Sequence, residues 1–323
     1  MRRAFFIVGP TATGKSELGA DVARELGAEI VSADAFQIYH GLDLLTAKPD
    51  ASTLAKAPHH LIGTTPLDEE MNAEKYRRAA THAINEINSR GRLAIIVGGS
   101  GLYIKALSYG LAPLPECDPK LREKLNAMSL NELRLQLLKR DPEAARKIDM
   151  KNRRCVVRAL EICLLTGKPA STQREQWSVA ASLREAQRAG VMAGRRGASH
   201  SEAATGVFVF RDREELYARI NQRVEAMFEK GVIEEVRASR ATSATASQMI
   251  GLREIRELLE GRMSLLQCIA QIQQATRRYA KRQLTWFRRQ TSFSPLNLSL
   301  LSHNEAVKWI LLRMLSEVRT RDD

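Results

Sequence analysis

The sequence has little of what marks secreted, zinc-binding or membrane proteins. It contains four cysteines in 323 residues, and no two of them form a C-x-x-C pair. This scarcity does not fit a disulfide framework and favours a reducing, cytoplasmic environment. The six histidines are scattered apart from His59-His60, which does not fit the ligand spacing of a zinc site. No apolar run approaches the roughly 18 residues of a membrane span, so we expect a cytoplasmic protein without a membrane partner.

Acidic residues are missing from one long stretch. Between Gly261 and His303 there is no Asp or Glu, whereas solvated charged faces normally mix both signs. Aromatic residues, among them Tyr279 and Trp286, lie within this stretch, and the whole chain has a net charge of +13 at pH 7. A one-sided basic cluster of this kind is typical of contact with a phosphate backbone. Its cations are Arg262, Arg277, Arg278, Lys281, Arg282, Arg288 and Arg289.

A phosphate-binding motif lies near the amino terminus. Residues 9–16 match G-x-x-x-x-G-K-[ST] and read Gly9-Pro10-Thr11-Ala12-Thr13-Gly14-Lys15-Ser16. An apolar run of strand length, residues 4–8, precedes the motif, and apolar residues recur at helical spacing from Leu18 to Leu26. In this context backbone N–H groups and a helix N-terminus converge on phosphate oxygens. Lys15 adds a positive charge and Ser16 a hydroxyl for Mg²⁺.

Further apolar runs predict a parallel sheet. They lie at residues 29–33, 93–97 and 207–210, and helical segments separate them. This alternation indicates crossover connections and an α/β fold of the P-loop NTPase type, with helices flanking the sheet. Ligands gather at the carboxyl ends of parallel strands. Asp34 and the loop at residues 98–101 both follow strand ends, so we expect both to face the phosphate loop.

The pattern divides the chain into three parts. Residues 1–114 form the first part of the α/β core. Residues 115–205 carry helix-start signals and no strand pattern, which predicts an all-helical insertion. Its end, residues 171–205, is rich in Ala, Ser, Gly and Arg without periodicity, so we expect a flexible loop there. Residues 206–323 complete the core and add a basic helical C-terminal region, with a long helix at about residues 265–287.

Four classes of protein are compatible with this phosphate loop. Motor and switch NTPases hold Mg²⁺ with an aspartate at the end of an apolar strand, whereas residues 93–97 are followed by Gly98-Gly99, which argues against that class. A small-molecule kinase stays open, with Asp34 as the base for an acceptor hydroxyl. A transferase whose loop grips a pyrophosphate leaving group also stays open. The fourth class is a non-enzymatic RNA-binding protein whose loop senses a nucleoside triphosphate.

An ordered series of motifs extends over nearly the whole chain. After the phosphate loop come Ser32-Ala33-Asp34 with Gln37 and Tyr39, Thr46-Ala47-Lys48-Pro49, Pro58-His59-His60, residues 98–103, Asn152-Arg153-Arg154 with residues 158–161, residues 166–169, residues 250–254 and residues 276–288. This series resembles the bacterial tRNA dimethylallyltransferase (tRNA isopentenyltransferase) family. The loop motif is common to many nucleotide-binding proteins, whereas the ordered set is specific.

The resemblance implies an activity and a set of catalytic groups. The activity is transfer of a dimethylallyl group from the co-substrate dimethylallyl pyrophosphate to the exocyclic amine of the adenosine immediately 3′ to the anticodon in tRNA. An allylic pyrophosphate leaves with several negative charges, which need preorganised positive charge. By the resemblance residues 9–16, Mg²⁺ on Ser16, and Arg219 and Arg223 bind the pyrophosphate. The implied catalytic residues are Lys15, Ser100 and Asp34, the last as the general base for a poorly nucleophilic amine.

The resemblance also implies the RNA contacts. An enzyme that modifies a base must take that base out of its stack, and loop bases are read on their edges. The helical insertion and the basic stretch are expected to hold the tRNA anticodon stem-loop from two sides, with the protein as a monomer. The implied tRNA contacts are Asp34, Ala35, Phe36, Gln37, Ser100, Arg122, Arg154, Arg158, Gln248, Gly251, Arg253, Arg277, Arg278, Lys281, Arg282 and Arg288.

Three positions depart from the family pattern. Ala35 replaces the usual serine, Ser100 replaces threonine, and Leu252 stands where tyrosine is common. The nearest alternative is an adenylate isopentenyltransferase, which shares the loop, the aspartate and the prenyl donor but uses free AMP, ADP or ATP. The basic stretch favours tRNA, because a free nucleotide needs no such surface.

Overall fold

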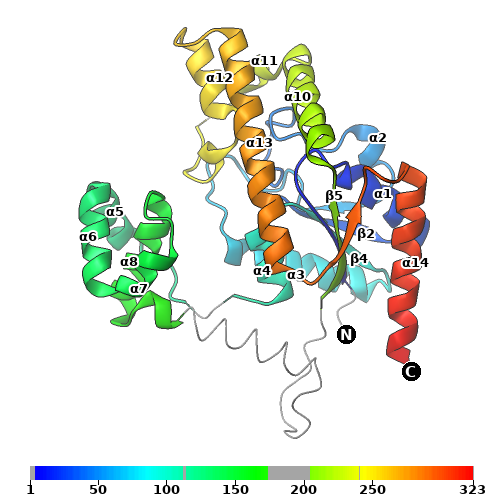
Figure 1. Ribbon diagram of the computed structural model, residues 1–323, viewed down its shortest axis with the longest axis horizontal. Helices are drawn as coiled ribbons and strands as arrows, with labels where there is room; N and C mark the ends of the chain where they lie inside the picture. Colours follow the sequence, from blue (N-terminus) through cyan, green and yellow to red (C-terminus); the bar gives the residue numbers. More distant parts are fainter. Residues whose placement is uncertain (1–3, 112–113, 174–203, 240, 323) are drawn as a thin grey trace, which may run out of the picture. The chain divides into compact units, whose positions relative to one another are not determined.

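Residues 4–111, 114–173, 204–239 and 241–322 are described by the computed structural model, which divides into two units. Met1–Ser108 and Glu202–Asp323 form the first unit, and Tyr109–Ser201 form the second (Figure 1). Most of the predicted flexible loop at 171–205 lies outside the described residues. None of the described helices is long and apolar enough to cross a membrane.

A six-stranded parallel sheet forms the centre of the first unit, which confirms the predicted P-loop type of α/β fold. The strand order is β3-β2-β4-β1-β5-β6. The strands are β1 (Ala4–Val8), β2 (Glu29–Ala33), β3 (His59–His60), β4 (Ala94–Gly98), β5 (Thr205–Phe210) and β6 (Ser294–Asn297). The sequence did not predict β3 or β6, because β3 has two residues and β6 contains Pro295, so neither shows an alternating apolar pattern.

Helices cover both faces of the sheet. In the first unit they are α1 (Lys15–Leu26), α2 (Ala51–Leu54), α3 (Ala73–Ser89), α4 (Gly101–Ser108), α10 (Arg213–Glu229), α11 (Val232–Arg237), the short 3₁₀ helix η1 (Ala246–Gln248), α12 (Leu252–Leu259), α13 (Leu265–Gln290) and α14 (His303–Asp322). Side chains alternate along β1, so that Phe5 and Ile7 enter one apolar cluster and Phe6 and Val8 enter the other. Helices α1 and α14 pack on the first face (Figure 1), and α3, α4 and α13 contribute to the opposite cluster.

The register of the sheet aligns three strand ends. Val8 at the end of β1 and Ala33 at the end of β2 both pair with Gly98 at the end of β4. The loops that follow these strands therefore begin at the same level of the sheet. The phosphate loop, Asp34 and Ser100 are brought to one edge by this register.

The long basic helix α13 runs from Leu265 to Gln290, a turn longer at its carboxyl end than the predicted helix. Its start is fixed by a capping box, in which the side chains of Ser264 and Gln267 bond each other's backbone N–H groups. Along its length α13 contacts α10, α12 and α4 (Figure 1). It therefore connects the basic stretch of the sequence to the edge of the sheet.

The second unit is helical throughout its described elements: α5 (Pro119–Ala127), α6 (Leu130–Arg140), α7 (Pro142–Lys147) and α8 (Arg153–Thr166). Asp118 caps α5, and Ser129 with Glu132 forms a capping box on α6. Its apolar core encloses a fully buried carboxylate, Glu161. This carboxylate accepts hydrogen bonds from Arg122 at 3.0 Å and Arg158 at 2.6 Å. A buried charge needs such partners, so both arginines have a structural role here.

A second buried carboxylate, Glu29 at the start of β2, stabilises the sheet. Its side chain is 3% exposed and contacts Arg90 at 2.8 Å, Arg92 at 3.2 Å and His60 at 2.7 Å. Burial by itself would raise the pKa of Glu29, but the hydrogen bonds from Arg90 and His60 reverse the shift and hold that pKa at about 2. The charged form is therefore favoured in the folded protein.

We expect Glu29→Gln to lower the free energy of unfolding at neutral pH by up to about 3 kcal/mol, the value of a pKa held near 2 instead of 4.5. Because the folded-state pKa is depressed, this contribution is complete above about pH 4.5 and is lost as the pH falls toward 2. Urea unfolding of both proteins at pH 7 and pH 3 measures the difference, with the exposed Glu25→Gln as control. A gap that is equal at both pH values would contradict the assignment.

Candidate active site at the carboxyl edge of the sheet

Hydrogen bonds to its own backbone and to β4 fix the phosphate loop between β1 and α1. The N–H of Gly9 donates to the carbonyl oxygen of Gly98 at 3.2 Å, and the Thr13 hydroxyl donates to the carbonyl oxygen of Pro10 at 3.0 Å. Gly14 has a φ of 91°, a conformation that favours glycine, directly before α1. The loop therefore leads into the N-terminus of α1, where unpaired N–H groups attract an anion.

Lys15 is buried beside this loop, with 9% of its surface exposed. Its Nζ donates to the carbonyl oxygen of Pro10 at 3.2 Å. Burial lowers the pKa of Lys15 to about 8; the negative charge of Asp34 opposes the shift, and the positive charge of Arg223 adds to it. These mutual effects show that the structure brings Lys15, Asp34 and Arg223 into one electrostatic cluster.

Three arginines outside the loop donate hydrogen bonds to it. Arg223 of α10 donates to the Thr11 hydroxyl at 2.9 Å, and Arg219, one turn earlier, donates to the carbonyl oxygen of Ala12 at 3.0 Å. Arg211, directly after β5, donates to the carbonyl oxygen of Thr13 at 2.9 Å. Arg219 and Arg223 were predicted from the sequence, whereas Arg211 was not, because its only signal is its position after a strand end.

One N–H group of the Arg223 guanidinium makes no hydrogen bond to the described residues. Its Nε is buried and has no hydrogen-bond partner among the described residues. Burial lowers the pKa of Arg223, the charge of Asp34 opposes this shift, and the charge of Arg219 adds to it. A buried cationic donor without a partner favours an anionic ligand, since an unsatisfied buried polar group is costly.

Asp34 and Ser100 connect the ends of β2 and β4. The Asp34 carboxylate accepts hydrogen bonds from the N–H groups of Phe36 at 2.9 Å and Gln37 at 3.2 Å, both through Oδ1. The Ser100 hydroxyl oxygen accepts from the N–H of Ala35 at 2.8 Å. Asp34 therefore caps a turn with one oxygen and keeps the other for different contacts. The serine-to-alanine departure at position 35 leaves the Ser100 contact intact, because that contact uses the backbone.

Neutral phenol groups surround the Asp34 carboxylate. Burial raises the pKa of Tyr76, Tyr103 and Tyr279, and the negative charge of Asp34 contributes to each shift. Tyr76 and Tyr103 stack with their ring centroids 3.9 Å apart, and Ser100 lies close enough to Tyr279 of α13 to lower its pKa in part. These phenols stay protonated at neutral pH, so the anionic group in this cluster is Asp34.

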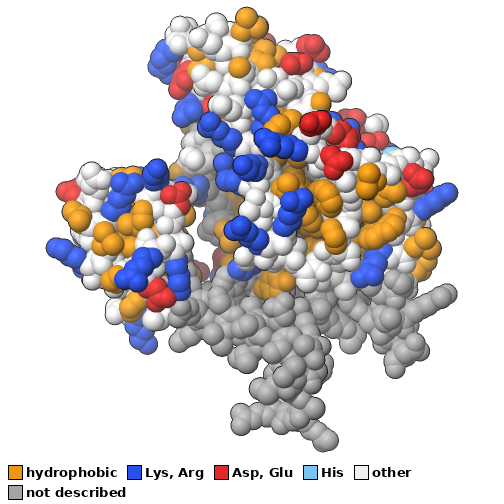
Figure 2. Space-filling view, in the orientation of Figure 1, with side chains coloured by type: hydrophobic (Ala, Val, Ile, Leu, Met, Phe, Trp, Pro, Cys, Tyr) orange, Lys and Arg blue, Asp and Glu red, His pale blue; other side chains and the backbone are white. Residues whose placement is uncertain are grey.

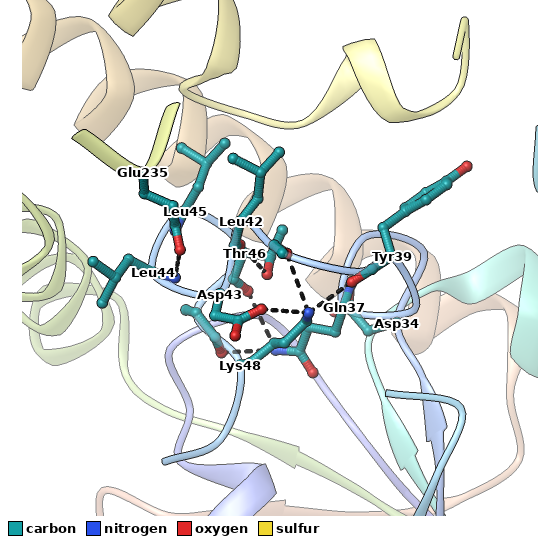
Figure 3. A network of polar contacts seen from close by, with 12 residues as sticks. Asp34, Gln37, Tyr39, Leu42, Asp43, Leu44, Leu45, Thr46, Lys48 and Glu235 are labelled. Atoms are coloured by element: carbon teal, nitrogen blue, oxygen red, sulfur yellow. Dashed lines mark hydrogen bonds and ion pairs between the residues drawn. The ribbon is translucent and has the colours of Figure 1, made fainter. Parts of the chain in front are cut away.

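The segment after Asp34 is braced by polar contacts (Figure 3). The Gln37 amide donates to the carbonyl oxygen of Ala47 at 2.8 Å, and Lys48 donates to the carbonyl oxygen of Tyr39 at 2.6 Å. The Glu235 carboxylate of α11 accepts from two consecutive N–H groups, those of Leu44 and Leu45, both at 2.9 Å. Gln37, implied as an RNA contact, therefore uses its side-chain amide to hold residues 37–48 in place.

The predicted RNA surface lies along α13. Exposed cations lie on this helix, and Figure 2 shows Lys and Arg side chains gathered along it. A hollow of about 590 Å³, here called the basic groove, is lined by Arg278, Lys281, Arg282, Thr285, Trp286, Arg289 and Gln290. Arg288 is exposed and lies over the Phe210 ring, whereas Arg277 donates to Asn221 at 2.5 Å. Only part of the predicted set therefore lines the groove.

The predicted contacts in residues 248–253 differ in exposure. Gln248 and Arg253 are exposed, and Arg253 contacts the Glu254 carboxylate at 2.8 Å. Gly251 is buried with a φ of 97°, and a Cβ there would lie 2.9 Å from Leu45. Leu252 is 1% exposed and packs in the core. The residue at the position where tyrosine is common in the family is thus unavailable for base stacking.

In the second unit, the predicted RNA contacts Arg122 and Arg158 are the partners of the buried Glu161. Arg154 is exposed at the start of α8. Of these three guanidinium groups, that of Arg154 is the one directed to solvent without an ion pair among the described residues. The sequence alone could not distinguish Arg154 from Arg122 and Arg158, because only the fold shows that Glu161 is buried.

Comparison with known proteins identifies similar chains. Residues 37–290 match the family described as IPP transferase. The tRNA dimethylallyltransferase 1 of Citrifermentans bemidjiense is 41% identical over 283 residues, which cover 86% of this chain and 87% of that protein. The tRNA dimethylallyltransferase of Geobacter sulfurreducens is 38% identical over 94% of this chain and 90% of its own length. The solved tRNA isopentenylpyrophosphate transferase of Bacillus halodurans superposes with a TM-score of 0.68 at 31% identity, covering 100% of this chain and 98% of that one.

The pKa of about 8 for Lys15 predicts pH-dependent anion binding. Lys15 is charged below this pH and loses its charge as the pH rises through it, so the affinity for pyrophosphate should fall between pH 7 and pH 9. Lys15→Arg keeps its charge across this range. We expect the Kd of the wild type, relative to that of the variant, to rise by up to about 10-fold over this interval. Calorimetry measures both Kd values, and the ionisation of pyrophosphate itself cancels in their ratio. A ratio that stays constant from pH 7 to pH 9 would contradict the lowered pKa of Lys15.

Proposed function

We propose that this chain, which belongs to the IPP transferase family, transfers a dimethylallyl group from dimethylallyl pyrophosphate to the exocyclic amine of the adenosine immediately 3′ to the anticodon in tRNA, with release of pyrophosphate. The observation that carries the proposal is the cluster at the sheet edge. The phosphate-loop Lys15 and Arg223 of α10 lie close enough to the Asp34 carboxylate for its negative charge to raise the pKa of each. All of these groups belong to the first unit, so we propose that one chain suffices for activity.

The donor side stabilises a leaving group. The bond between the allylic carbon and the diphosphate oxygen breaks, and both electrons go to the oxygen. The largely buried Lys15 and the buried Nε of Arg223 supply fixed positive charge and a donor without a partner among the described residues, and such interactions are stronger away from bulk water. These groups need no reorganisation as charge develops on the diphosphate.

Magnesium fits this site as an additional cation. Mg²⁺ usually takes few protein ligands and completes its shell with phosphate oxygens and water. Ser16, half-buried in the first turn of α1, offers the one hydroxyl that such a shell requires. When bound, Mg²⁺ would neutralise part of the diphosphate charge. The chain's own residues orient the donor and exclude water.

The acceptor side removes a proton. As the amine nitrogen bonds to the allylic carbon, its proton passes to the Asp34 carboxylate. Oδ1 is held by the N–H groups of Phe36 and Gln37, so we propose that Oδ2 receives the proton. Ser100, held by the N–H of Ala35, lies next to the base, where its hydroxyl can orient the amine.

RNA binding is assigned to the basic groove of α13. Lys281, Arg282 and their neighbours offer positive charge to phosphates, and Trp286 offers a ring on which an unstacked base can lie. The same helix carries Tyr279 to Ser100, so it links the groove to the reacting edge. A free nucleotide would leave most of this groove empty, and the similar proteins are named as tRNA-modifying enzymes. Both points favour tRNA over AMP, ADP or ATP as the acceptor.

Replacing Asp34 with Asn tests the base. Asparagine still offers a carbonyl oxygen to the N–H groups of Phe36 and Gln37, so the turn is kept while the proton acceptor is lost. We expect kcat for prenyl transfer to fall by roughly 10²- to 10⁴-fold, with unchanged binding of an anticodon stem-loop RNA. Single-turnover assays and fluorescence anisotropy measure the two quantities. Asp68→Asn, at an exposed site, is the matched control. Full turnover by Asp34→Asn would exclude Asp34 as the general base.

Acceptor choice is tested by competition. Labelled dimethylallyl pyrophosphate is offered with unmodified tRNA, with AMP, or with both, and the label is followed in each acceptor. We expect label in tRNA and none in AMP, because the groove contributes binding energy only to a polyanion. Activity should also fall steeply with added salt, since bound phosphates release counterions. Label in AMP alone would replace the proposal by an adenylate isopentenyltransferase.

A further inference from the structure

Gln283 of α13 is a buried polar residue that the proposed reaction leaves without a role. It is 6% exposed, although the residues before it, Lys281 and Arg282, are exposed in the basic groove. Its Oε1 accepts a hydrogen bond from the N–H of Thr11 at 2.9 Å, and its Nε2 donates to the carbonyl oxygen of Gly99 at 2.9 Å. One amide therefore connects three elements: the phosphate loop, the turn between β4 and α4, and the basic helix.

The surroundings of Gln283 are shaped to admit this amide. A Cβ at Gly99 would lie 2.4 Å from the Gln283 Nε2 and 2.9 Å from the carbonyl oxygen of Gly9. A side chain at position 99 would therefore displace either the amide or the loop backbone. The glycine makes room for the contact, and the contact holds both backbones at fixed separation.

The contact also determines what Thr11 presents to a ligand. Its backbone N–H is bonded to Gln283, while its hydroxyl accepts from Arg223. Thr11 thus lies between the two helices that border the loop, α10 and α13. Without the amide, the N–H of Thr11 would lose its partner, and among the described residues the loop would lose its hydrogen bond to α13.

We propose that Gln283 is a positioning residue, which holds the phosphate loop and the β4–α4 turn in place against α13 and so sets the affinity for the diphosphate. It touches neither substrate. The proposal rests on the proposed function for the identity of the donor, but it concerns the diphosphate portion alone. Inorganic pyrophosphate is therefore a sufficient probe, and the result does not depend on prenyl transfer.

The test uses Gln283→Met, which keeps the length and helix propensity of the side chain and removes both hydrogen bonds. We expect the Kd for inorganic pyrophosphate with Mg²⁺, measured by calorimetry, to rise roughly 10- to 100-fold, the range expected when a binding group is displaced by about 1 Å. The KM for dimethylallyl pyrophosphate should rise with it. The Kd for an anticodon stem-loop RNA should stay at the wild-type value, because the groove cations are unchanged. Gln274→Ala, exposed on the same helix, is the control.

Gln283→Asn is the second variant and decides the case if the methionine variant does not fold. It keeps the amide donor and acceptor without adding charge, but it is one methylene shorter and cannot bond Thr11 and Gly99 together, so we expect a smaller rise in the pyrophosphate Kd. An unchanged pyrophosphate Kd in the folded variants overturns the proposal, and so does an equal loss of RNA affinity, which would mean general unfolding. If the wild type binds pyrophosphate but transfers no prenyl group, while Gln283→Met binds pyrophosphate weakly, the positioning role stands and the proposed reaction falls.

Discussion

The parallel register around Gly98 is the constraint on which the site depends. Because the ends of β1 and β2 both pair with the same residue of β4, three loops begin at one level of the sheet. The backbone bond between Gly9 and Gly98, and the bond from the Ser100 N–H to the carbonyl oxygen of Ala33, then hold these loops together. Parallel strands buried on both faces leave little freedom for this edge. A slip of one residue in the pairing of β2 with β4 alone would shift the Asp34 carboxylate relative to the phosphate loop.

The charges of Lys15, Arg223 and Asp34 also depend on one another. Lys15 and Arg223 lose hydration on burial, which weakens their charged forms, and Asp34 returns part of that stabilisation to each. The protein thus keeps two cations and one anion close together without bringing them into a closed ion pair that would satisfy all three. We propose that a diphosphate supplies the missing negative charge.

Much of this could be predicted from the sequence, because short-range patterns carried it. The loop at residues 9–16, the strands before and after it and the position of Asp34 at a strand end follow from local signals, and the resemblance of ordered motifs led to the family. What could not be predicted depends on long-range contacts. Arg211 and Gln283 reach the loop from residues far along the chain, and no local pattern marks them. The roles of Arg122 and Arg158 depend on the burial of Glu161, and the burial of Leu252 depends on the packing of α12 and α13.

The turn at residues 34–37 has a geometric consequence for Asp34, the proposed general base. With Oδ1 held by two N–H groups, the carboxylate cannot rotate to exchange its oxygens, so its remaining lone pairs have one fixed direction. An incoming nucleobase must then be oriented by the protein edge it meets, since the acceptor atom cannot follow it. A glutamate at this position is longer by one methylene. Its carboxylate could not both accept from the N–H groups of Phe36 and Gln37 and meet the nucleobase in the same place. The short side chain is therefore a stereochemical requirement as well as a chemical one.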